Sequence, residues 1–292
     1  MVQKAVELNL KTIGRKILPS TARRLLWSGR TSARRLMENL KLAGLLTRTW
    51  GKKPGSWVRY DEYRVRINDG PNFYLLCKDL FVRKLYHFTA GIPNPRILDC
   101  GGNIGMSILY FKHLYPQSRI IAFEPDPAIF PYLKDNVREN RLENVTLMQA
   151  AVTKEEGTLA FYSDGLYGSC LADHASRGIP EGWTRYDVPC VRLSKYLDGP
   201  VDLLKMNIEG AEYDVISECA GQLRQVRELI IEYHHLPGLP RTLHRILSIL
   251  HECGFEYLIN DFDSETNPGV RAPFELAPES RYFLLIYARR VA

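Results

Sequence analysis

Long apolar runs are missing from this sequence, since none approaches the roughly 18 residues that a membrane-spanning helix needs. No charged start leads into a continuous apolar stretch, which argues against a secretory signal. The six cysteines include no C-x-x-C pair, so the spacing of common zinc and dithiol sites is also absent. We therefore expect a protein without a membrane span or a metal site, located in the cytoplasm, where thiols stay reduced.

Acidic residues are scarce at the start of the chain. The first 53 residues hold thirteen Lys and Arg but only Glu7 and Glu38, a net charge of +11, whereas the rest of the chain carries a net −5. Residues 5–18 and 31–46 have helical spacing. We interpret residues 1–56 as a basic helical extension that is separate from the body of the protein.

The sequence leaves the role of this extension open. Basic helices can lie on an anionic membrane surface, bind nucleic acid, or pack on the body or on a second copy of the chain. Packing, with the charges in water, is the favoured interpretation, and the acidic body and the lack of a recognisable RNA-binding module argue against an RNA substrate. An Arg-rich, acid-poor start would also suit a mitochondrial transit peptide in a eukaryotic source.

The body, residues 57–292, has the pattern of an α/β domain. Residues 57–90 are interpreted as a lead-in, with a strand pair over 57–67 and a helix over 80–88 that Asp79 caps. The core, residues 91–292, alternates short apolar strands with helices, and an insert over 157–192 interrupts this alternation. The expected strands are 97–98, 119–123, 145–148, the start of 201–212, 229–234, 255–259 and 283–287. This pattern predicts a doubly wound, Rossmann-like sheet of seven mostly parallel strands.

A glycine-rich turn follows the first core strand and has the pattern D-x-G-G-N-x-G. Its residues are Asp99, Gly101, Gly102, Asn103 and Gly105. Gly101 and Gly102 are expected to take positive φ and to let a ligand approach the backbone, while Gly105 lets the next helix pack close to the sheet. Asp99 is expected either to accept a hydrogen bond from an ammonium group or to hold the loop. The turn is therefore predicted to hold a ligand.

The second core strand ends in Glu124, about 20 to 25 positions after the turn, the spacing at which such folds bind ribose hydroxyls. Pro125 and Asp126 then lead into a helix, and Gln149 and Ala150 are expected to flank an adenine. A dinucleotide site would show G-x-G-x-x-G instead. The acid and the open backbone of this turn favour S-adenosyl-L-methionine as the cofactor.

Polar residues also follow the fourth and fifth core strands. The candidates for acid-base chemistry at the end of one strand are Lys205, Asn207, Glu209 and Glu212, and those at the end of the next are Glu232, His234 and His235. Because a histidine side chain ordinarily has a pKa near the working pH, His234 is expected to be the general base, with Glu209 as the alternative. The histidine could equally cap the strand.

Taken together, residues 99–105, 123–125, 204–212 and 231–234 resemble the FkbM-type S-adenosylmethionine-dependent methyltransferases, over about residues 75–260. The resemblance implies a class I methyltransferase fold and O-methylation of hydroxyls on natural products or sugars. It also places the strand-end histidine of the family at His234.

Two positions depart from the pattern of the family. Gly102 stands where Ala is usual, and Asn207 stands where Asp is usual, so a metal-ligand or base role for position 207 is in doubt. A small-molecule or glycan acceptor is expected and nucleic acid is not. Two other functions compete with this prediction: an RNA methyltransferase, suggested by the basic extension, and a nucleoside-binding scaffold without catalysis, suggested by Asn207.

Overall fold

The computed structural model describes residues 40–166, 169–171, 179, 181–236, 238–260 and 282–291. The chain forms two compact units, residues 1–50 and residues 51–292. Residues 40–49 of the first unit are helical, so the helix expected over 31–46 ends three residues later than predicted. The helix expected over 5–18 lies outside the described residues. Within the described part of the chain, no helix has the length and apolar character to cross a membrane.

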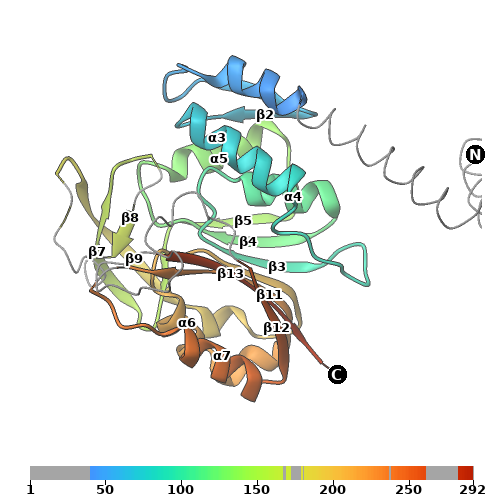
Figure 1. The fold of residues 1–292 in the computed structure, drawn as a ribbon, viewed down its shortest axis with the longest axis vertical. Helices are drawn as coiled ribbons and strands as arrows, with labels where there is room; N and C mark the ends of the chain where they lie inside the picture. Colours follow the sequence, from blue (N-terminus) through green and yellow to red (C-terminus); the bar gives the residue numbers. More distant parts are fainter. Residues whose placement is uncertain are drawn as a thin grey trace, which may run out of the picture. The chain divides into compact units, whose positions relative to one another are not determined.

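The second unit is built on a seven-stranded sheet (Figure 1). The strands in spatial order are β12 (Phe255–Asn260), β13 (Tyr282–Arg290), β11 (Val226–His235), β10 (Val201–Met206), β3 (Arg96–Cys100), β4 (Arg119–Phe123) and β5 (Val145–Met148). All neighbours from β11 to β5 are parallel, and β13 runs antiparallel to both β11 and β12. The seven-stranded, mostly parallel sheet predicted from the sequence is confirmed.

The order of the strands places a crevice at one edge of the sheet. The chain runs outward from β3 through β4 to β5 and later returns to β10 on the other side of β3. At such a reversal the connections leave in opposite directions, so ligands bind at the carboxyl ends of the strands. The reversal lies between β3 and β10, beside the glycine-rich turn, as predicted.

Helices cover both faces of the sheet. Figure 1 shows α4 (Met106–Leu114) and α5 (Phe130–Glu139) on one side and α6 (Glu212–Glu218) and α7 (Leu243–Glu252) on the other. With both faces covered, the central strands are apolar throughout, and Ile97, Leu98 and Leu204 are fully buried. The continuous apolar runs of the sequence therefore reflect burial on both sides.

The lead-in before the sheet is partly as predicted and partly different. The hairpin of β1 (Trp57–Tyr60) and β2 (Tyr63–Arg66) is present, and the backbone N–H of Arg66 donates to Asn136 Oδ1 of α5 at 2.6 Å. The hairpin is thus bound to the core.

The helix predicted over 80–88 is wrong. The helix α3 spans Gly70–Cys77 instead, and the carboxylate of Asp69 caps it by accepting the N–H of Asn72 at 2.6 Å. A Gly-Pro pair resembles a turn, but proline is well suited to the first turn of a helix, where its missing N–H has no partner. A π-helical turn, Lys78–Val82, follows and ends before Lys84, which has a φ of 60°.

The insert over residues 157–192 forms a second sheet together with β6 (Ala151–Thr153), which precedes it. This sheet has four strands in the order β6, β9 (Thr184–Arg192), β7 (Gly157–Ser163) and β8 (Ser169–Leu171). The Ser163 hydroxyl at the end of β7 donates a hydrogen bond to the carboxylate of Asp126, just after β4. This bond fixes the insert beside the carboxyl edge of the main sheet.

Candidate active site

The glycine-rich turn between β3 and α4 is shaped by backbone contacts. Gly101 has a φ of 89°, and a Cβ there would lie 1.9 Å from the carbonyl oxygen of Asn207. Gly105 has a φ of 93° and precedes α4, where a Cβ would lie 2.9 Å from Leu133. Both positions therefore favour glycine, because both have a left-handed backbone and, at Gly101, the backbone of the neighbouring loop also leaves no room for a side chain.

Gly102 does not have the positive φ expected from the sequence, so that prediction is wrong. The N–H groups of Gly101 and Gly102 both donate to the carbonyl of Phe123, at 2.9 and 2.8 Å, which holds Gly102 in an ordinary conformation. A Cβ on Gly102 would meet Leu133 at 3.4 Å, an ordinary contact. An alanine at this position would therefore fit.

Glu124 ends β4 and supports this turn. Its two carboxylate oxygens accept the N–H of Asn103 at 2.7 Å and the N–H of Asp126 at 3.0 Å. Burial raises the pKa of Glu124 to about 7, although both N–H donors act in the opposite direction. Each carboxylate oxygen has a second lone pair, so the group can accept further donors.

A narrow cavity of about 60 Å³ opens beside Glu124. Of the predicted cofactor residues, Gly101, Glu124, Pro125 and Ala150 line it. Its other lining residues come from the ends of β4 and β10 and from the insert: Phe123, Ala151, Val152, Phe161, Asn207, Ile208 and Glu209. A carboxylate that can accept hydrogen bonds from ribose hydroxyls, next to apolar side chains, suits a nucleoside. The volume of the cavity is large enough for only part of a nucleoside.

Six predicted cofactor residues do not line this cavity, among them Gly102 and Gly105 of the turn. Gln149 is exposed, whereas Asp126 is buried and accepts the N–H of Ala128 at 2.7 Å. Asn103 has a φ of 46° and its side chain accepts the N–H of Ile104 at 2.8 Å. Asp99 is fully buried below the turn. In the structure Asp126, Asn103 and Asp99 shape the loops around the cavity.

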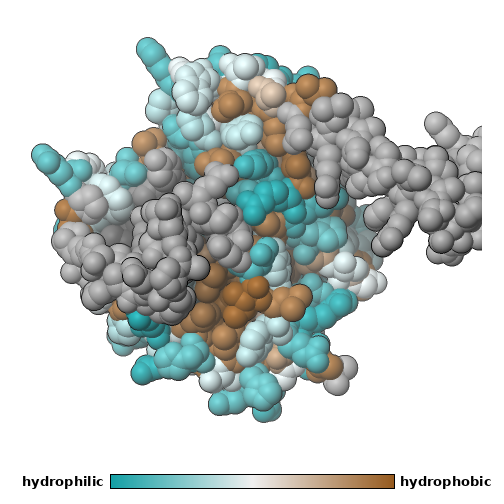
Figure 2. All heavy atoms as spheres, viewed as in Figure 1, coloured by the Kyte–Doolittle hydropathy of each residue, from teal (hydrophilic) through white to brown (hydrophobic). Residues whose placement is uncertain are grey.

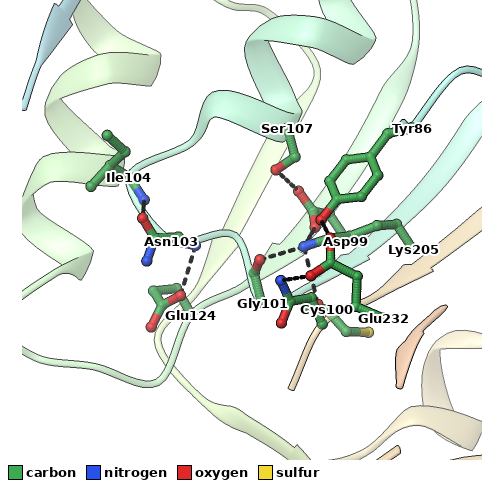
Figure 3. A network of polar contacts seen from close by, with 11 residues as sticks. Tyr86, Asp99, Cys100, Gly101, Asn103, Ile104, Ser107, Glu124, Lys205 and Glu232 are labelled. Atoms are coloured by element: carbon green, nitrogen blue, oxygen red, sulfur yellow. Dashed lines mark hydrogen bonds and ion pairs between the residues drawn. The ribbon is translucent and has the colours of Figure 1, made fainter. Parts of the chain in front are cut away.

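Asp99 belongs to a buried network with Lys205 (Figure 3). The Ser107 hydroxyl donates to Asp99 Oδ2 at 2.5 Å, and Lys205 Nζ lies 3.0 Å from Asp99 Oδ1. Lys205 Nζ also donates to the carbonyl of Gly101 at 2.5 Å and is only 2% exposed. Lys205 therefore joins β10 to the glycine-rich turn, and Asp99 compensates its charge.

Asn207 belongs to a neighbouring network around Glu232. The Asn207 amide nitrogen donates to Glu232 Oε2 at 2.8 Å, and the Tyr86 hydroxyl donates to Glu232 Oε1. Burial raises the pKa of Glu232. The neutral side chain of Asn207 adds no charge next to this carboxyl group. An Asp at position 207 would instead place a second carboxylate against Glu232, which is costly in a buried site. A neutral, hydrogen-bond-donating Asn at position 207 is therefore compatible with the buried Glu232 beside it.

His234 lies at the end of β11 in a third polar group. Its Nδ1 lies 2.8 Å from Glu212 Oε1, and its Nε2 lies 3.8 Å from Glu209 Oε1. Burial alone would lower the pKa of His234, but Glu209 and Glu212 outweigh it and raise the pKa to about 9. The ring is therefore mostly imidazolium at neutral pH. Glu212 also accepts the N–H of Gly210 at 3.1 Å, so one buried carboxylate fixes both the ring and the turn.

A second cavity, of about 410 Å³, lies beside His234. It is lined by Gly210 and Ala211 of the turn after β10, by Thr153 of β6 and by Thr158 of β7. Tyr213, Leu239 and Arg245 extend the wall along α6 and toward α7. On the face viewed in Figure 2, an apolar area lies near the positions of α6 and β13 in Figure 1, with hydrophilic surface around it.

The structure brings most of the predicted catalytic residues to one edge of the sheet. Asn207 and Glu209 line the narrow cavity, and His234 lines the larger one. Lys205 lies beneath them, bound to the turn. Ser107 and Tyr86 bind site residues but were not identified as candidates from the sequence. Glu212 and Glu232 were candidates because they lie at the ends of the two strands, whereas Tyr86 is 146 positions from the acid that it binds.

Comparison with known proteins identifies the family to which the chain belongs. The model of the methyltransferase FkbM domain matches residues 99–257, more than half of the chain. Methyltransferase 1 of Beauveria bassiana (strain ARSEF 2860) is 35% identical over 178 residues, which cover 53% of this chain and 72% of that protein. The 31-O-demethyl-FK506 methyltransferase FkbM of Streptomyces tacrolimicus is 27% identical over 213 residues, covering 62% and 80%.

Among solved structures, the methyltransferase FkbM from Methylobacillus flagellatus KT aligns with a TM-score of 0.42 and 13% identity, covering 87% of this chain and 60% of that one. The family assignment rests on the sequence match, which spans the glycine-rich turn, Glu124 and the ends of β10 and β11. The chain belongs to the FkbM methyltransferase family, and its cofactor is S-adenosylmethionine.

Proposed function

We propose that this methyltransferase is an O-methyltransferase that modifies a hydroxyl of a small molecule, a natural product or a glycan. The narrow cavity beside Glu124 holds the donor, and the cavity of about 410 Å³ beside His234 holds the acceptor. The main support for this proposal is that nearby residues of the same three chain segments line both cavities.

Three segments run from one cavity to the other. In the turn after β10, Asn207 to Glu209 line the donor cavity and Gly210 and Ala211 line the acceptor cavity. In β6, Val152 lines the first and Thr153 the second. In β7, Phe161 lines the first and Leu159 the second. A group held in one cavity therefore has a short path to a group held in the other, as transfer requires.

The charges around the acceptor cavity are largely compensated within the protein. Lys154 lies 3.3 Å from Asp214, and His234 lies 2.8 Å from Glu212. The guanidinium of Arg245 lies over the ring of Tyr213, 5.5 Å from its centre. A cavity of paired charges, hydroxyls and one aromatic ring suits a neutral, hydroxyl-bearing molecule. The name of the Streptomyces relative describes O-methylation, which supports the same acceptor group.

The cofactor supplies an electrophilic methyl group, so the protein mainly has to position the partners and exclude water. In this proposal Glu124 accepts the ribose hydroxyls, and Lys205 with Asp99 holds the turn in place. His234 takes the acceptor proton. Because its pKa is about 9, His234 is active as a base only in the small neutral fraction at pH 7, and the rate should rise up to about pH 9.

The proposal is tested in two stages. Isothermal titration of the whole protein with S-adenosylmethionine and S-adenosylhomocysteine measures donor binding, and a labelled methyl group then reports transfer to a panel of hydroxyl-bearing molecules. Binding of donor and transfer to a hydroxyl support the proposal. Transfer only to RNA would replace it with an RNA methyltransferase, and donor binding without transfer to any substrate class would favour the scaffold.

A further inference from the structure

Residues 40–49 form a helix in the first unit (blue in Figure 1), and this helix has one buried and one exposed side. Leu42 and Leu45 are 4% and 0% exposed, whereas Leu40 and Trp50 are 63% and 71% exposed. The backbone N–H of Trp50 donates to the carbonyl of Leu46 at 2.9 Å, so Trp50 continues the helical turn. Two large apolar side chains are therefore exposed on a helix that already buries others.

The exposed apolar side chains lie on the same side of this helix. At about 100° per residue, positions that follow one another by three, seven and ten residues fall within a sector of about 80°. Four exposed residues have this spacing: Leu40, Ala43, Thr47 and Trp50. A Cβ built at Gly44, next to this sector, would meet no atom of the described residues within 4 Å. We call these four residues the Trp50 face.

Positive charge accompanies the Trp50 face and is not balanced locally. From Asn39 to Tyr60 the chain holds five Lys and Arg and no Asp or Glu. Arg48 belongs to the same helix, and Lys52 and Lys53 follow Trp50 within three positions. These three side chains are exposed, and within the described part of the chain none of them pairs with a carboxylate. A basic, acid-free stretch therefore adjoins an exposed apolar one.

This combination fits the surface of an anionic lipid bilayer. Trp and Leu lie favourably at the level of the headgroups, while Lys and Arg interact with acidic lipids, and stable binding needs both contributions. A nucleic acid would engage the basic residues but leave Leu40 without a partner. A second copy of the chain would bring two equally basic stretches together across a two-fold axis, which repulsion between like charges opposes.

We propose that the Trp50 face, with Arg48, Lys52 and Lys53, binds the surface of anionic membranes. The apolar side chains enter the headgroup region, and the basic side chains bind the acidic lipids. The helix lies on the membrane and does not cross it. This inference concerns the location of the protein and does not depend on the acceptor of the methyl group.

The test is co-sedimentation of the whole protein with vesicles of phosphatidylcholine, with and without phosphatidylserine. Wild type should bind the anionic vesicles at least about tenfold more tightly, and raising the salt from about 0.1 M to about 1 M should remove most of this preference. Trp50→Ser should weaken the binding about tenfold, because apolar contact is lost. The triple variant Arg48→Gln, Lys52→Gln and Lys53→Gln should weaken it by about tenfold or more.

Each variant has a matched control in the second unit. Leu258 of β12 is 76% exposed, so Leu258→Ser removes an equally exposed apolar side chain. Lys134, Arg224 and Arg290 are exposed, and changing all three to Gln removes the same total charge. Both controls should bind anionic vesicles within about twofold of wild type, because charges away from the contact are screened by salt.

Every other outcome would overturn the inference. Wild type that does not bind anionic vesicles, unchanged binding in Trp50→Ser, or equal losses in the controls would each do so. RNA binding that needs Arg48, Lys52 and Lys53, without vesicle binding, would identify a nucleic acid as the partner. Self-association that is lost in Trp50→Ser, again without vesicle binding, would identify a second copy. If Trp50→Ser does not fold, Leu40→Ser tests the same face.

Discussion

The two halves of the site are built in different ways. On the β3–β4 side, most hydrogen bonds involve backbone groups. Glu124 accepts two backbone N–H groups, and the N–H groups of Gly101 and Gly102 donate to one carbonyl. On the β10–β11 side, side chains bind one another, as in the Glu212–His234 pair and the contact of Asn207 with Glu232. In the proposed function, the backbone side holds the donor, which is the same in every methyl transfer, and the side-chain networks contact the acceptor, which differs between enzymes.

This comparison predicts that the two halves can be damaged separately. The largest effect is expected on the acceptor side. His234→Gln should lower turnover by about 10² to 10⁴ while donor affinity stays intact, because the ring is proposed to take the acceptor proton. In wild type the rate should rise with pH up to about 9, the pKa of His234, and this rise should disappear in the variant. Near-normal turnover would move the role to Glu209 or to positioning alone.

The two halves touch at Gly101, and a change there should damage both. A Cβ at Gly101 would lie 1.9 Å from the carbonyl of Asn207, and the backbone there is left-handed. Gly101→Ala should therefore lower the free energy of unfolding by about 3 kcal/mol or more. The neighbouring Gly102→Ala is the control and should cost less than about 1 kcal/mol. Equal chemical-denaturation midpoints for the two variants would contradict this packing.

On the donor side, Glu124→Ala should weaken binding of S-adenosylmethionine by about 1.5 to 3 kcal/mol. The pKa of Glu124 is about 7 in the free protein, and ribose hydroxyls favour its ionised form. Donor affinity should therefore improve as the pH rises through about 7, with proton release on binding below that pH. Calorimetry in buffers of different ionisation enthalpy measures the released protons. A dissociation constant that is unchanged in the variant would remove Glu124 from the site.

The smallest effect is expected from the basic extension. The chain divides into two compact units, residues 1–50 and residues 51–292, and among the described residues those that line the two cavities belong to the second unit. Deleting residues 1–50 should leave donor affinity within about threefold, since those contacts remain. Binding to anionic vesicles and self-association, compared between the full chain and the deletion, test the other expected roles. Loss of donor binding in a folded deletion would place the extension in the site.

The sequence predicted the backbone half of the site better than the side-chain half. Glycines at fixed spacing and an acid at a strand end are local signals, so the turn around Gly101 and the place of Glu124 could be predicted. Whether Gly102 would need positive φ depends on the carbonyl of Phe123, which is distant in the sequence. The capped start of α3 was missed for a different reason, because Gly70-Pro71 also occurs in turns.

The protonation of His234 could not be predicted from its own segment. Its pKa follows from burial by neighbouring elements and from Glu209, in the turn after β10, and Glu212, at the start of α6. The role of Asn207 as a hydrogen-bond donor to a buried acid likewise becomes clear only from the structure, in which Glu232 of the neighbouring strand lies beside it. The protonation of these side chains depends on which strands are neighbours in the sheet, and the order of the strands cannot be read directly from the sequence.

The most direct test of the account fills the proposed acceptor cavity without touching the donor cavity. Thr158 lies on β7, is exposed and lines the larger cavity only, so Thr158→Trp should block the acceptor. Thr146→Trp on β5 is the matched control, because Thr146 is an exposed strand threonine that lines neither cavity. The account predicts that Thr158→Trp retains the donor dissociation constant and loses methyl transfer to the best hydroxyl acceptor, while Thr146→Trp retains both. Full transfer by Thr158→Trp would contradict it.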